Sequence, residues 1–523
     1  MISRAILRLL FVCLAVGACG VLPLDSPLGS LSCGGSSGGM ATVAAAEPLL
    51  AGVGKVDITN VEAGPVSDPL FARALVLKSG STTAVLVTVD AVSIGEIGYI
   101  GNDYLPKVRE RLVEELKIDP THFVVNASHC HGIVCKDVAE RTVQAVKQAF
   151  SNLVPVKTGV GVGHENRVSE NRRLKLKSGK EADVRHAYSL PPDDEVVGTG
   201  PIDPQIGILK IDRQDGRPLA VVYNFACHPI QGVPSGGNTA DITGFSSKAI
   251  EESLGEGSVA LFVQGCAGDI NPTKYKDVDG PRDAEPLGNL LGLSVLRALK
   301  QIKTAESAPL KIVNSPLELP RADLAPRIES LQQEQATVLR SLRGTSLNLK
   351  TFVPLYVKYH VAADFPSYYS HRYMHEKAIN REDLANLDAA NRRNLNAYVN
   401  NIHAMELLTR MQTNLDLLKK HQAQNLAAPK RMLDVEVVGL RVGEFVLVTF
   451  PGELTVQIGL NIKQKSPHPN TFVAGYTNGY IYYAPTEEQL KNVGNAQEDS
   501  DCILAPGWQG LFEDKVAEVL KKL

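Results

Sequence analysis

The sequence lacks an excess of either charge, since its 54 Lys and Arg residues nearly balance its 57 Asp and Glu residues. The basic surplus of a nucleic-acid-binding protein is therefore missing, and no acidic tract predicts a disordered tail. No Gly-x-Ser-x-Gly elbow joins a predicted strand to a predicted helix, which argues against an enzyme with a serine nucleophile. The sequence also contains no internal repeat, so a repeat architecture is not expected.

Cysteine is scarce, and its spacing gives no disulfide framework. Three of the eight cysteines fall in the first 46 residues. The other five are Cys130, Cys135, Cys227, Cys266 and Cys502. Five is an odd number, and although export would allow a bridge, the pattern does not predict a set of pairs.

The N-terminal segment reads as an export signal and not as part of the fold. The stretch "MISRAILRLLFVCLAVGAC" places Arg4 and Arg8 beside an apolar core that is too short to span a membrane comfortably. The "VGAC" that ends it resembles a bacterial lipobox, in which the chain is cut before Cys19 and this cysteine then carries lipid. A rival cleavage site follows Ala46, and residues 20–46 are expected to form a flexible tether. We therefore expect export to the periplasm, to the outer membrane as a lipoprotein attached through Cys19, or into the medium.

Residues 47–523 are predicted to form one α/β domain with layered mixed sheets. Its strands include "TTAVLVTVDAV", "THFVVNAS", "PLAVVYNFA" and "VALFVQG", which are apolar, β-branched runs typical of buried strands. Helical spacing appears between them, as in "LPKVRERLVEELKI" and "DVAERTVQAVKQAF". This alternation favours helices packed on sheets.

The composition changes between residues 322 and 430. Two polar stretches with helical spacing, "RIESLQQEQATVLRSLRG" and "NNIHAMELLTRMQTNLDLLKKHQAQN", flank a segment rich in Tyr and His. We interpret residues 322–430 as a helical insertion. A solvated hairpin is favoured, and a hairpin over the site or a contact between subunits is the alternative.

The stretch "NASHCHG" places His129 and His131 on one side of a strand end, because side chains at i and i+2 of an extended segment point the same way. Either both histidines bind one metal ion, or one binds and the other supports a water or a substrate. Two histidines hydrogen-bonded to backbone in a loop are the alternative without a metal. Cys130 is adjacent, and we interpret it, like Cys227, as a small packing residue and not as a ligand.

Further candidate ligands follow other predicted strands. His228 ends the strand in "NFACHP", Glu453 follows the strand in "VTFPGEL", and a tyrosine loop reads "NGYIYYAPT". Ligands of α/β proteins gather at the carboxyl ends of strands. A zinc site with nitrogen and oxygen ligands and one position open to water is therefore expected there.

These motifs together resemble the neutral/alkaline non-lysosomal ceramidase family. The resemblance rests on "GVGKVDIT", "NASHCHG", "NFACHP", "VQGCAGDINP", "TFPGEL" and "NGYIYYAPT", in this order. It runs from about residue 51 to the end of the chain and is interrupted at the insertion. It implies the family's catalytic domain, one zinc ion per chain, and cleavage of an N-acyl amide by zinc-bound water. The implied partner is an acylated small molecule or lipid.

The resemblance also implies roles for individual residues. His129, His228 and Glu453 would bind zinc, and the family's ligand tyrosine corresponds to Tyr483, with Tyr480 and Tyr482 as alternatives for that register. The implied catalytic residues are His131, Arg172 (with Arg173 as its rival) and Asn271, and the residues themselves add Asp269, whose alternative role is that of a turn acid in a Gly-rich loop. His131, Arg172 or Tyr483 would stabilise the oxyanion, and His131 would also protonate the leaving amine. Asp269 would orient a histidine.

Three departures from the family pattern put ceramide itself in doubt as the substrate. Asn271 stands where the family has a functional serine. The family's Y-E-G tyrosine has no clear counterpart, since "VGNAQEDS" occupies that place, and the family's added C-terminal β-sandwich is not found in this sequence. Hydrolysis of another N-acyl or ester substrate, or a non-catalytic exported binding protein on this scaffold, therefore stays open.

Overall fold

The computed structural model describes residues 48–184, 190–232, 237–273, 275, 280, 282–306, 309–367 and 369–523. The predicted export signal, Cys19 and the rival cleavage site after Ala46 lie outside these residues. The described elements form one compact unit, Glu47–Leu523. Among them, no helix is both long and apolar enough to cross a membrane.

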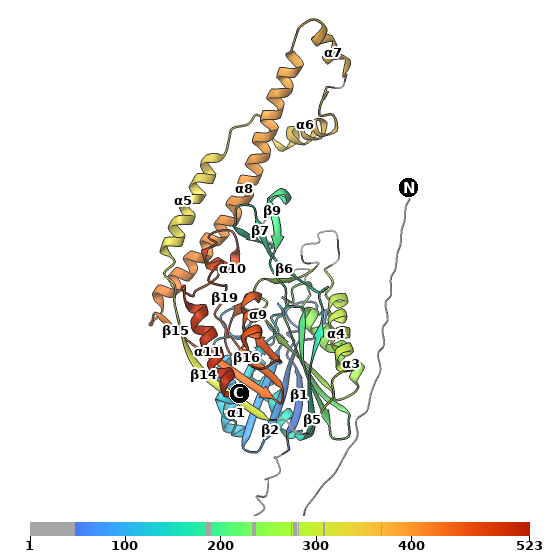
Figure 1. Cartoon of the computed structure of the whole chain (residues 1–523), viewed down its shortest axis with the longest axis vertical. Coiled ribbons are helices and arrows are strands. Elements are labelled where there is room, and N and C mark those ends of the chain that lie inside the picture. The colour runs from blue at the N-terminus through green and yellow to red at the C-terminus, as the bar shows by residue number, and fades with distance from the viewer. Residues whose placement is uncertain are drawn as a thin grey trace, which may run out of the picture. The chain divides into compact units, whose positions relative to one another are not determined.

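The centre of the unit is an eight-stranded mixed sheet (Figure 1). In spatial order its strands are β12 (Val259–Gln264), β11 (Pro218–Phe225), β10 (Gln205–Arg213), β5 (Val154–His164), β1 (Leu50–Asp57), β2 (Phe71–Ser79), β3 (Thr82–Val89) and β4 (Phe123–Ala127). Only the β3–β4 and β11–β12 pairs are parallel, and the others are antiparallel.

A four-stranded sheet packs on one face of the large sheet. It consists of β14 (Leu310–Pro320), β15 (Met432–Val442), β16 (Phe445–Thr449) and β18 (Thr471–Ala474). Alternate side chains of the two sheets fill the space between them, and Leu75 and Leu86 of the large sheet share one buried cluster with Leu447 and Phe472 of the small one. Gly207 allows this approach, because a Cβ atom there would lie 2.2 Å from the Phe472 ring.

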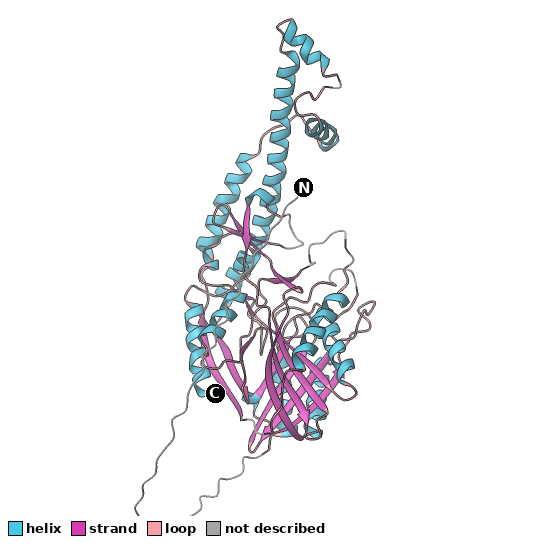
Figure 2. Ribbon diagram, turned by 45° about the vertical axis from the view of Figure 1, so that its right-hand side comes forward, coloured by secondary structure: helices cyan, strands magenta, loops and turns pink. Residues whose placement is uncertain are grey.

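Helices cover the outer faces of both sheets (Figure 2). The large sheet is covered by α1 (Tyr104–Leu116), α2 (Val138–Ser151), α3 (Asp241–Leu254) and α4 (Glu285–Leu299). The small sheet is covered by α9 (Val456–Lys465) and α11 (Trp508–Lys522). Gly52 and Gly54 let α2 lie directly on β1, since a Cβ atom at either position would meet a helix carbonyl oxygen at about 2 Å.

The predicted layered α/β fold with mixed sheets is confirmed, but strand direction is more antiparallel than helix–strand alternation indicated. In a flat sheet of this order, β4 and β11 would run in opposite directions and end at opposite edges. The sheet instead folds back on itself: β5 pairs with β1 over only two residues, and β12 contacts β2, β3 and β4. The carboxyl ends of β4 and β11 therefore meet.

Gln264 shows that these ends meet. It stands at the end of β12, is fully buried, and accepts a hydrogen bond from the backbone N–H of Gly265 at 3.0 Å. Its side-chain amide donates to the carbonyl of Ser128, which follows β4, at 3.0 Å, and to the carbonyl of Cys227, which follows β11, at 2.8 Å. Its backbone N–H donates to Asn126 Oδ1 at 2.8 Å. One residue thus joins the two segments that carry candidate histidine ligands.

A group of helices lies between β14 and β15, within the segment predicted to be a helical insertion. Its helices are α5 (Ala325–Ser341), α6 (Leu349–Val361), α7 (His371–Ala378) and α8 (Asp383–Ala427). A small core of Leu331 from α5 with Met411, Leu415 and Leu418 from α8 holds the base of the hairpin together. Beyond this core, α6, α7 and the first half of α8 extend away from the sheets (Figure 1). We name this outer part the arm, residues 349–395.

The base of α8 docks on loops beside the strand ends. Arg410 donates to the carbonyl oxygens of Asp183 and Asn495 and pairs with the Asp183 carboxylate at 2.6 Å. Further along, His421 Nε2 lies 2.6 Å from Asp501 Oδ1. The insertion is therefore a solvated hairpin at its outer end and a wall of the strand-end region at its base.

Short elements complete the unit. They are β6 (Ser169–Asn171), β7 (Arg173–Leu176), β8 (Glu181–Asp183), β9 (Val196–Thr199), β13 (Ile270–Pro272), β17 (Glu453–Leu454), β19 (Tyr483–Ala484) and α10 (Gln497–Ser500). Antiparallel β6–β13 and parallel β17–β19 pairs fix the loops around the strand ends.

Candidate metal centre

His129, His228 and Glu453 come together from three separate strand ends. His129 follows β4, His228 follows β11, and Glu453 begins β17 just after β16. One ligand atom from each lies within 4.8 Å of the others. Glu453 Oε2 is 3.2 Å from His228 Nε2 and 3.6 Å from His129 Nε2. Two imidazole nitrogens and a carboxylate oxygen around one point form a donor set that suits zinc.

Backbone carbonyls set the orientation of both imidazoles. His129 Nδ1 lies 2.6 Å from the carbonyl oxygen of Val92, and His228 Nδ1 lies 3.0 Å from that of Ile270. A carbonyl only accepts, so Nδ1 carries a proton in both rings, and Nε2 of each ring faces Glu453. This is the tautomer that a metal ligand requires.

Burial keeps His129 neutral. Its side chain is 2% exposed, and desolvation lowers its pKa to about 4, although Glu453 opposes this. Glu453 is ionised: burial alone would raise its pKa, but His129, His228 and the Tyr480 hydroxyl together hold the pKa well below its usual range. A neutral imidazole beside a carboxylate is ready to bind a cation without first losing a proton.

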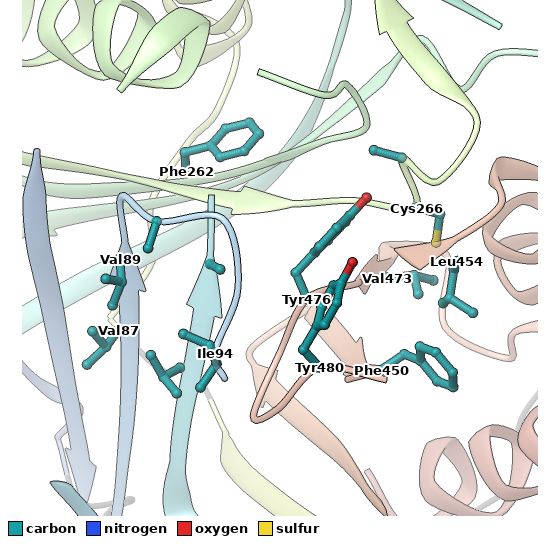
Figure 3. Packing of buried hydrophobic residues seen from close by; sticks show 14 of the residues in the cluster. Val87, Val89, Ile94, Phe262, Cys266, Phe450, Leu454, Val473, Tyr476 and Tyr480 are labelled. Carbon is teal, nitrogen blue, oxygen red and sulfur yellow. The ribbon is translucent and has the colours of Figure 1, made fainter. Parts of the chain in front are cut away.

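Two tyrosines hold the Glu453 carboxylate from the loop after β18. The Tyr480 hydroxyl donates to Oε1 at 2.5 Å and the Tyr476 hydroxyl donates to Oε2 at 3.2 Å. Figure 3 shows both rings rising from the same side, with their hydroxyl oxygens pointing the same way. Tyr476 also packs against His129, with ring centroids 4.3 Å apart. The carboxylate is thus fixed from both oxygens before any metal binds.

Strained backbone surrounds the site. His129, Tyr476 and Tyr482 have φ values of 68°, 53° and 64°, in the left-handed region that side chains with a Cβ avoid. At His129 the backbone N–H donates to Ala91 at 2.9 Å, which helps to hold this conformation. Residues in this strained conformation persist only where several contacts with their surroundings hold them in it, and they cluster at functional sites.

The three candidate tyrosines have different partners. Tyr480 contacts Glu453, as described above. Tyr483 is the register partner of Glu453 in the β17–β19 pair, and its hydroxyl accepts a hydrogen bond from Arg172 Nη2 at 3.2 Å. Tyr482 points elsewhere, since its hydroxyl donates to Glu96 at 3.3 Å and its ring packs against His421.

Arg172 lies beside the metal-ligand group in a cradle of acceptors. Its guanidinium donates to Glu498 Oε1 at 2.5 Å, to the Gly268 carbonyl at 2.5 Å and to Asn271 Oδ1 at 3.1 Å, besides Tyr483. Asn271 in turn donates to a backbone carbonyl and is fully buried. The residue that departs from the family's serine therefore positions Arg172.

A cavity of about 180 Å³ opens onto these groups. Its walls are formed by Val92, Ile97, His129, His131, Arg172, His228, Ile230, Tyr275, Glu453, Tyr480, Tyr483 and Asp501. His131 is exposed at its side, with its ring 5.6 Å from that of His129. The cavity thus joins the predicted ligands to His131 and Arg172, which are the predicted groups able to contact a substrate.

Asp269 and Arg173 lie behind the cavity. Asp269 accepts from the backbone N–H of Val456 at the start of α9 and from Asn171, so its partners are amides and not an imidazole. Arg173, the rival of Arg172, forms two hydrogen bonds with Asp499, at 2.8 and 2.9 Å. Both residues support the loops of the site and neither lines the cavity.

Sequence reasoning missed Gln264, Tyr476 and Glu498. Glu498 lies in "VGNAQEDS", a stretch that the sequence marks only by the lack of the family's tyrosine. In the structure the Glu498 carboxylate is fully buried against Arg172. A signal was present: the doublet Glu498–Asp499 matches the doublet Arg172–Arg173 in order and opposite charge. Carboxylates of this kind are buried only when they are paired.

The described cysteines are free thiols. Cys130, Cys227 and Cys266 are buried, and burial raises the pKa of each thiol well above its usual range. Cys266 packs near Leu454 in the apolar cluster of Figure 3. None of the three contributes a ligand atom to the His129, His228 and Glu453 group.

The fold and the site together define a layered α/β protein with a candidate metal centre at converging strand ends. Two solved structures share this fold: a ceramidase complexed with C2 (TM-score 0.57) and the neutral ceramidase from Pseudomonas aeruginosa (TM-score 0.58). Each is 17% identical to this chain, and each alignment covers 91% of this chain and 75% of the other. No protein-family model and no curated protein matches the sequence.

Proposed function

We propose that this chain is a zinc-dependent hydrolase of N-acyl amides, with ceramide as the first candidate substrate. One observation carries the proposal: His129, His228 and Glu453 bring two Nε2 atoms and a carboxylate oxygen to one point, on a fold shared with ceramidases. These residues would hold the ion, and Tyr480 or Tyr483 would complete the set. Zinc bound there supplies Lewis acidity and lowers the pKa of water to about 7.

The chain's own residues supply the rest of the chemistry. Arg172 and Tyr483 present a guanidinium and a hydroxyl at one wall of the cavity, where they can stabilise negative charge on a tetrahedral oxygen. Each such donor contributes about 3 kcal/mol in known cases. His131 is exposed at the same cavity and is placed to donate a proton to the departing amine. Asn271 and Glu498 hold the guanidinium in position.

Asn271 is compatible with activity because it performs a positioning task through its amide oxygen. An intact ligand group also argues against the alternative of a non-catalytic binding protein. Hydrolysis of another N-acyl or ester substrate remains the second candidate. We further propose that the protein is exported, with Cys19 as its lipid attachment site.

The test combines metal analysis with activity on residues 47–523, the compact unit that contains the three core clusters. Zinc per chain is measured, and hydrolysis of a fluorescent short-chain ceramide is followed before and after chelation and zinc return. His228→Ala should lose zinc and activity together. His122→Ala is the control, because its Nδ1 contacts only a backbone carbonyl of β3.

The outcomes separate the candidates. Zinc with chelation-sensitive cleavage supports a ceramidase. Zinc without cleavage of ceramide directs the assay to other N-acyl and ester substrates. A zinc content unchanged in His228→Ala would contradict the ligand assignment, and absence of zinc from the unsubstituted unit would favour the binding protein.

A further inference from the structure

Helix α6 of the arm is apolar on two opposite faces, but only one of them is covered. On the inner face, Phe352 stacks on Tyr398 of α8 with ring centroids 4.4 Å apart, and the Tyr359 hydroxyl donates to Asp388 of α8 at 2.6 Å. On the outer face, Val353 and Val357 are 48% and 53% exposed. The outer side of α6 therefore lacks the cover that α8 gives to its inner side.

Further exposed apolar side chains follow α6 in the sequence. We define the arm surface as nine exposed large apolar side chains: Leu349, Val353, Tyr356, Val357, Val361, Phe365, Tyr369, Met374 and Ile379. Of the 23 such side chains in the described part of the chain, these nine fall within a stretch of 31 residues. The first five follow helical spacing along one side of α6. Exposed apolar residues gathered in this way mark an interaction surface, whereas scattered ones do not.

The charge around the arm surface is positive although the chain as a whole is acidic. The whole arm, residues 349–395, contains seven basic residues and five acidic ones, against a net charge of -3 for the whole chain; three of the acidic residues, Glu382, Asp383 and Asp388, lie on α8 or at its start, and α6 itself carries Lys350 and Lys358 and no acidic residue. Glu376 is also occupied, because its carboxylate accepts the backbone N–H of Leu384 at the start of α8. A second copy of the arm would bring like charges together, whereas an anionic surface complements them.

We propose that the arm surface docks on an anionic lipid bilayer. The apolar side chains of α6 enter the boundary between headgroups and acyl chains, and the flanking lysines and arginines contact the acidic headgroups. Tyrosine suits this depth, because its ring is apolar and its hydroxyl is polar. The inference concerns where the unit is held, and it does not depend on the reaction proposed above.

The geometry of α8 gives the docking a spatial consequence. Its 45 residues rise about 1.5 Å each, so the tip of the arm lies roughly 55 Å along the axis from His421 beside the cavity. When the arm stands upright on a bilayer, the cavity is held well above the lipid. When the arm lies along the surface, the cavity approaches it.

The test is co-sedimentation of the unit 47–523 with vesicles, so that residues 1–46 contribute nothing. Vesicles of phosphatidylcholine alone are compared with vesicles that contain about one part in three of phosphatidylglycerol. The variant Val353→Asp with Val357→Asp puts two charges on the outer face of α6. Its matched control is Val61→Asp with Val197→Asp, since these valines are 75% and 62% exposed and lie outside the insertion.

We expect binding to anionic vesicles that weakens as salt is added, weaker binding to phosphatidylcholine alone, and at least about tenfold weaker binding for the arm variant. The control should bind as the parent does, and all proteins should show the same thermal transition. Equal binding by parent and arm variant, or no binding by the parent, would overturn the proposal. A parent that light scattering shows to be a dimer, and that Val353→Asp with Val357→Asp converts to a monomer, would assign the surface to a second copy instead.

Discussion

Replacement of Glu498 by glutamine tests whether the buried ion pair with Arg172 serves catalysis or only stability. The two side chains are 0% and 2% exposed and lie 2.5 Å apart, so solvent does not screen their interaction. Removing one partner of such a pair costs about 3–5 kcal/mol of unfolding free energy, which is the expected loss for Glu498→Ala. Glutamine keeps the shape and an acceptor oxygen for Arg172 Nε, and it loses only the charge.

The expected loss for Glu498→Gln is therefore about 1–2 kcal/mol, the difference between a charge-assisted and a neutral hydrogen bond. Arg172 keeps Asn271, Gly268 and Tyr483 as partners, so it stays at the cavity wall with an altered orientation and charge. If the guanidinium stabilises the transition state, a loss of this size corresponds to a fall in kcat of roughly 5- to 30-fold. Zinc content should not change, because Glu498 is not among the ligand atoms.

The assays are urea unfolding and kcat on one preparation of each variant, with zinc measured in both. Glu181→Gln is the control: Glu181 bonds to Arg173 at 2.7 Å, is 25% exposed and does not line the cavity. It should cost less than about 1 kcal/mol and leave kcat unchanged. A Glu498→Gln enzyme with reduced stability and unaltered kcat would refute the catalytic role of the pair, and a loss of zinc would show that the pair acts through the metal site.

Two further predictions concern the metal ligands. Tyr480→Phe should weaken zinc binding by about 10- to 100-fold, because it removes a donor to Glu453. Tyr483→Phe should lower kcat and leave the zinc content intact, because the Tyr483 hydroxyl contacts Arg172. The reverse result would make Tyr483 the ligand. Burial lowers the pKa of His129 to about 4, so the neutral ring persists to lower pH than an ordinary histidine, and zinc binding should stay level from about pH 8 to pH 5 and fall below it. Equilibrium dialysis that shows half the zinc lost near pH 6.5 would contradict the buried, neutral state of His129.

The layered fold and the three candidate metal ligands could be predicted because their signals are local. Buried strands were visible as β-branched runs, and each ligand follows such a run directly. His228 after "VVYNFA" and Glu453 after "FVLVTFP" required no knowledge of distant contacts. The insertion was visible for a similar reason, since its helical spacing contrasts with the strands on either side.

The residues that hold the ligands could not be predicted because they act through backbone or across long separations. The imidazoles are oriented by the backbone carbonyls of Val92 and Ile270. Every residue has a backbone carbonyl, so the sequence does not indicate which carbonyls act in this way. Gln264 spans two loops that meet only because the sheet folds back on itself. The direction of β4 relative to β11 also depends on pairing order, and strand pattern carries no information on it.

The distribution of the ligands along the chain also bears on the order of events as the protein matures. His129 lies in the first third of the sequence, Glu453 near its last seventh, and the loop with Tyr476 and Tyr480 comes later still. No N-terminal fragment that ends before Glu453 contains all three candidate ligands, and Tyr476, which packs against His129, comes later still. Because synthesis begins at the N-terminus, the candidate metal site can be completed only after nearly all of the chain has been made. For a protein that crosses a membrane unfolded, the compartment where folding finishes would decide which ion enters the site.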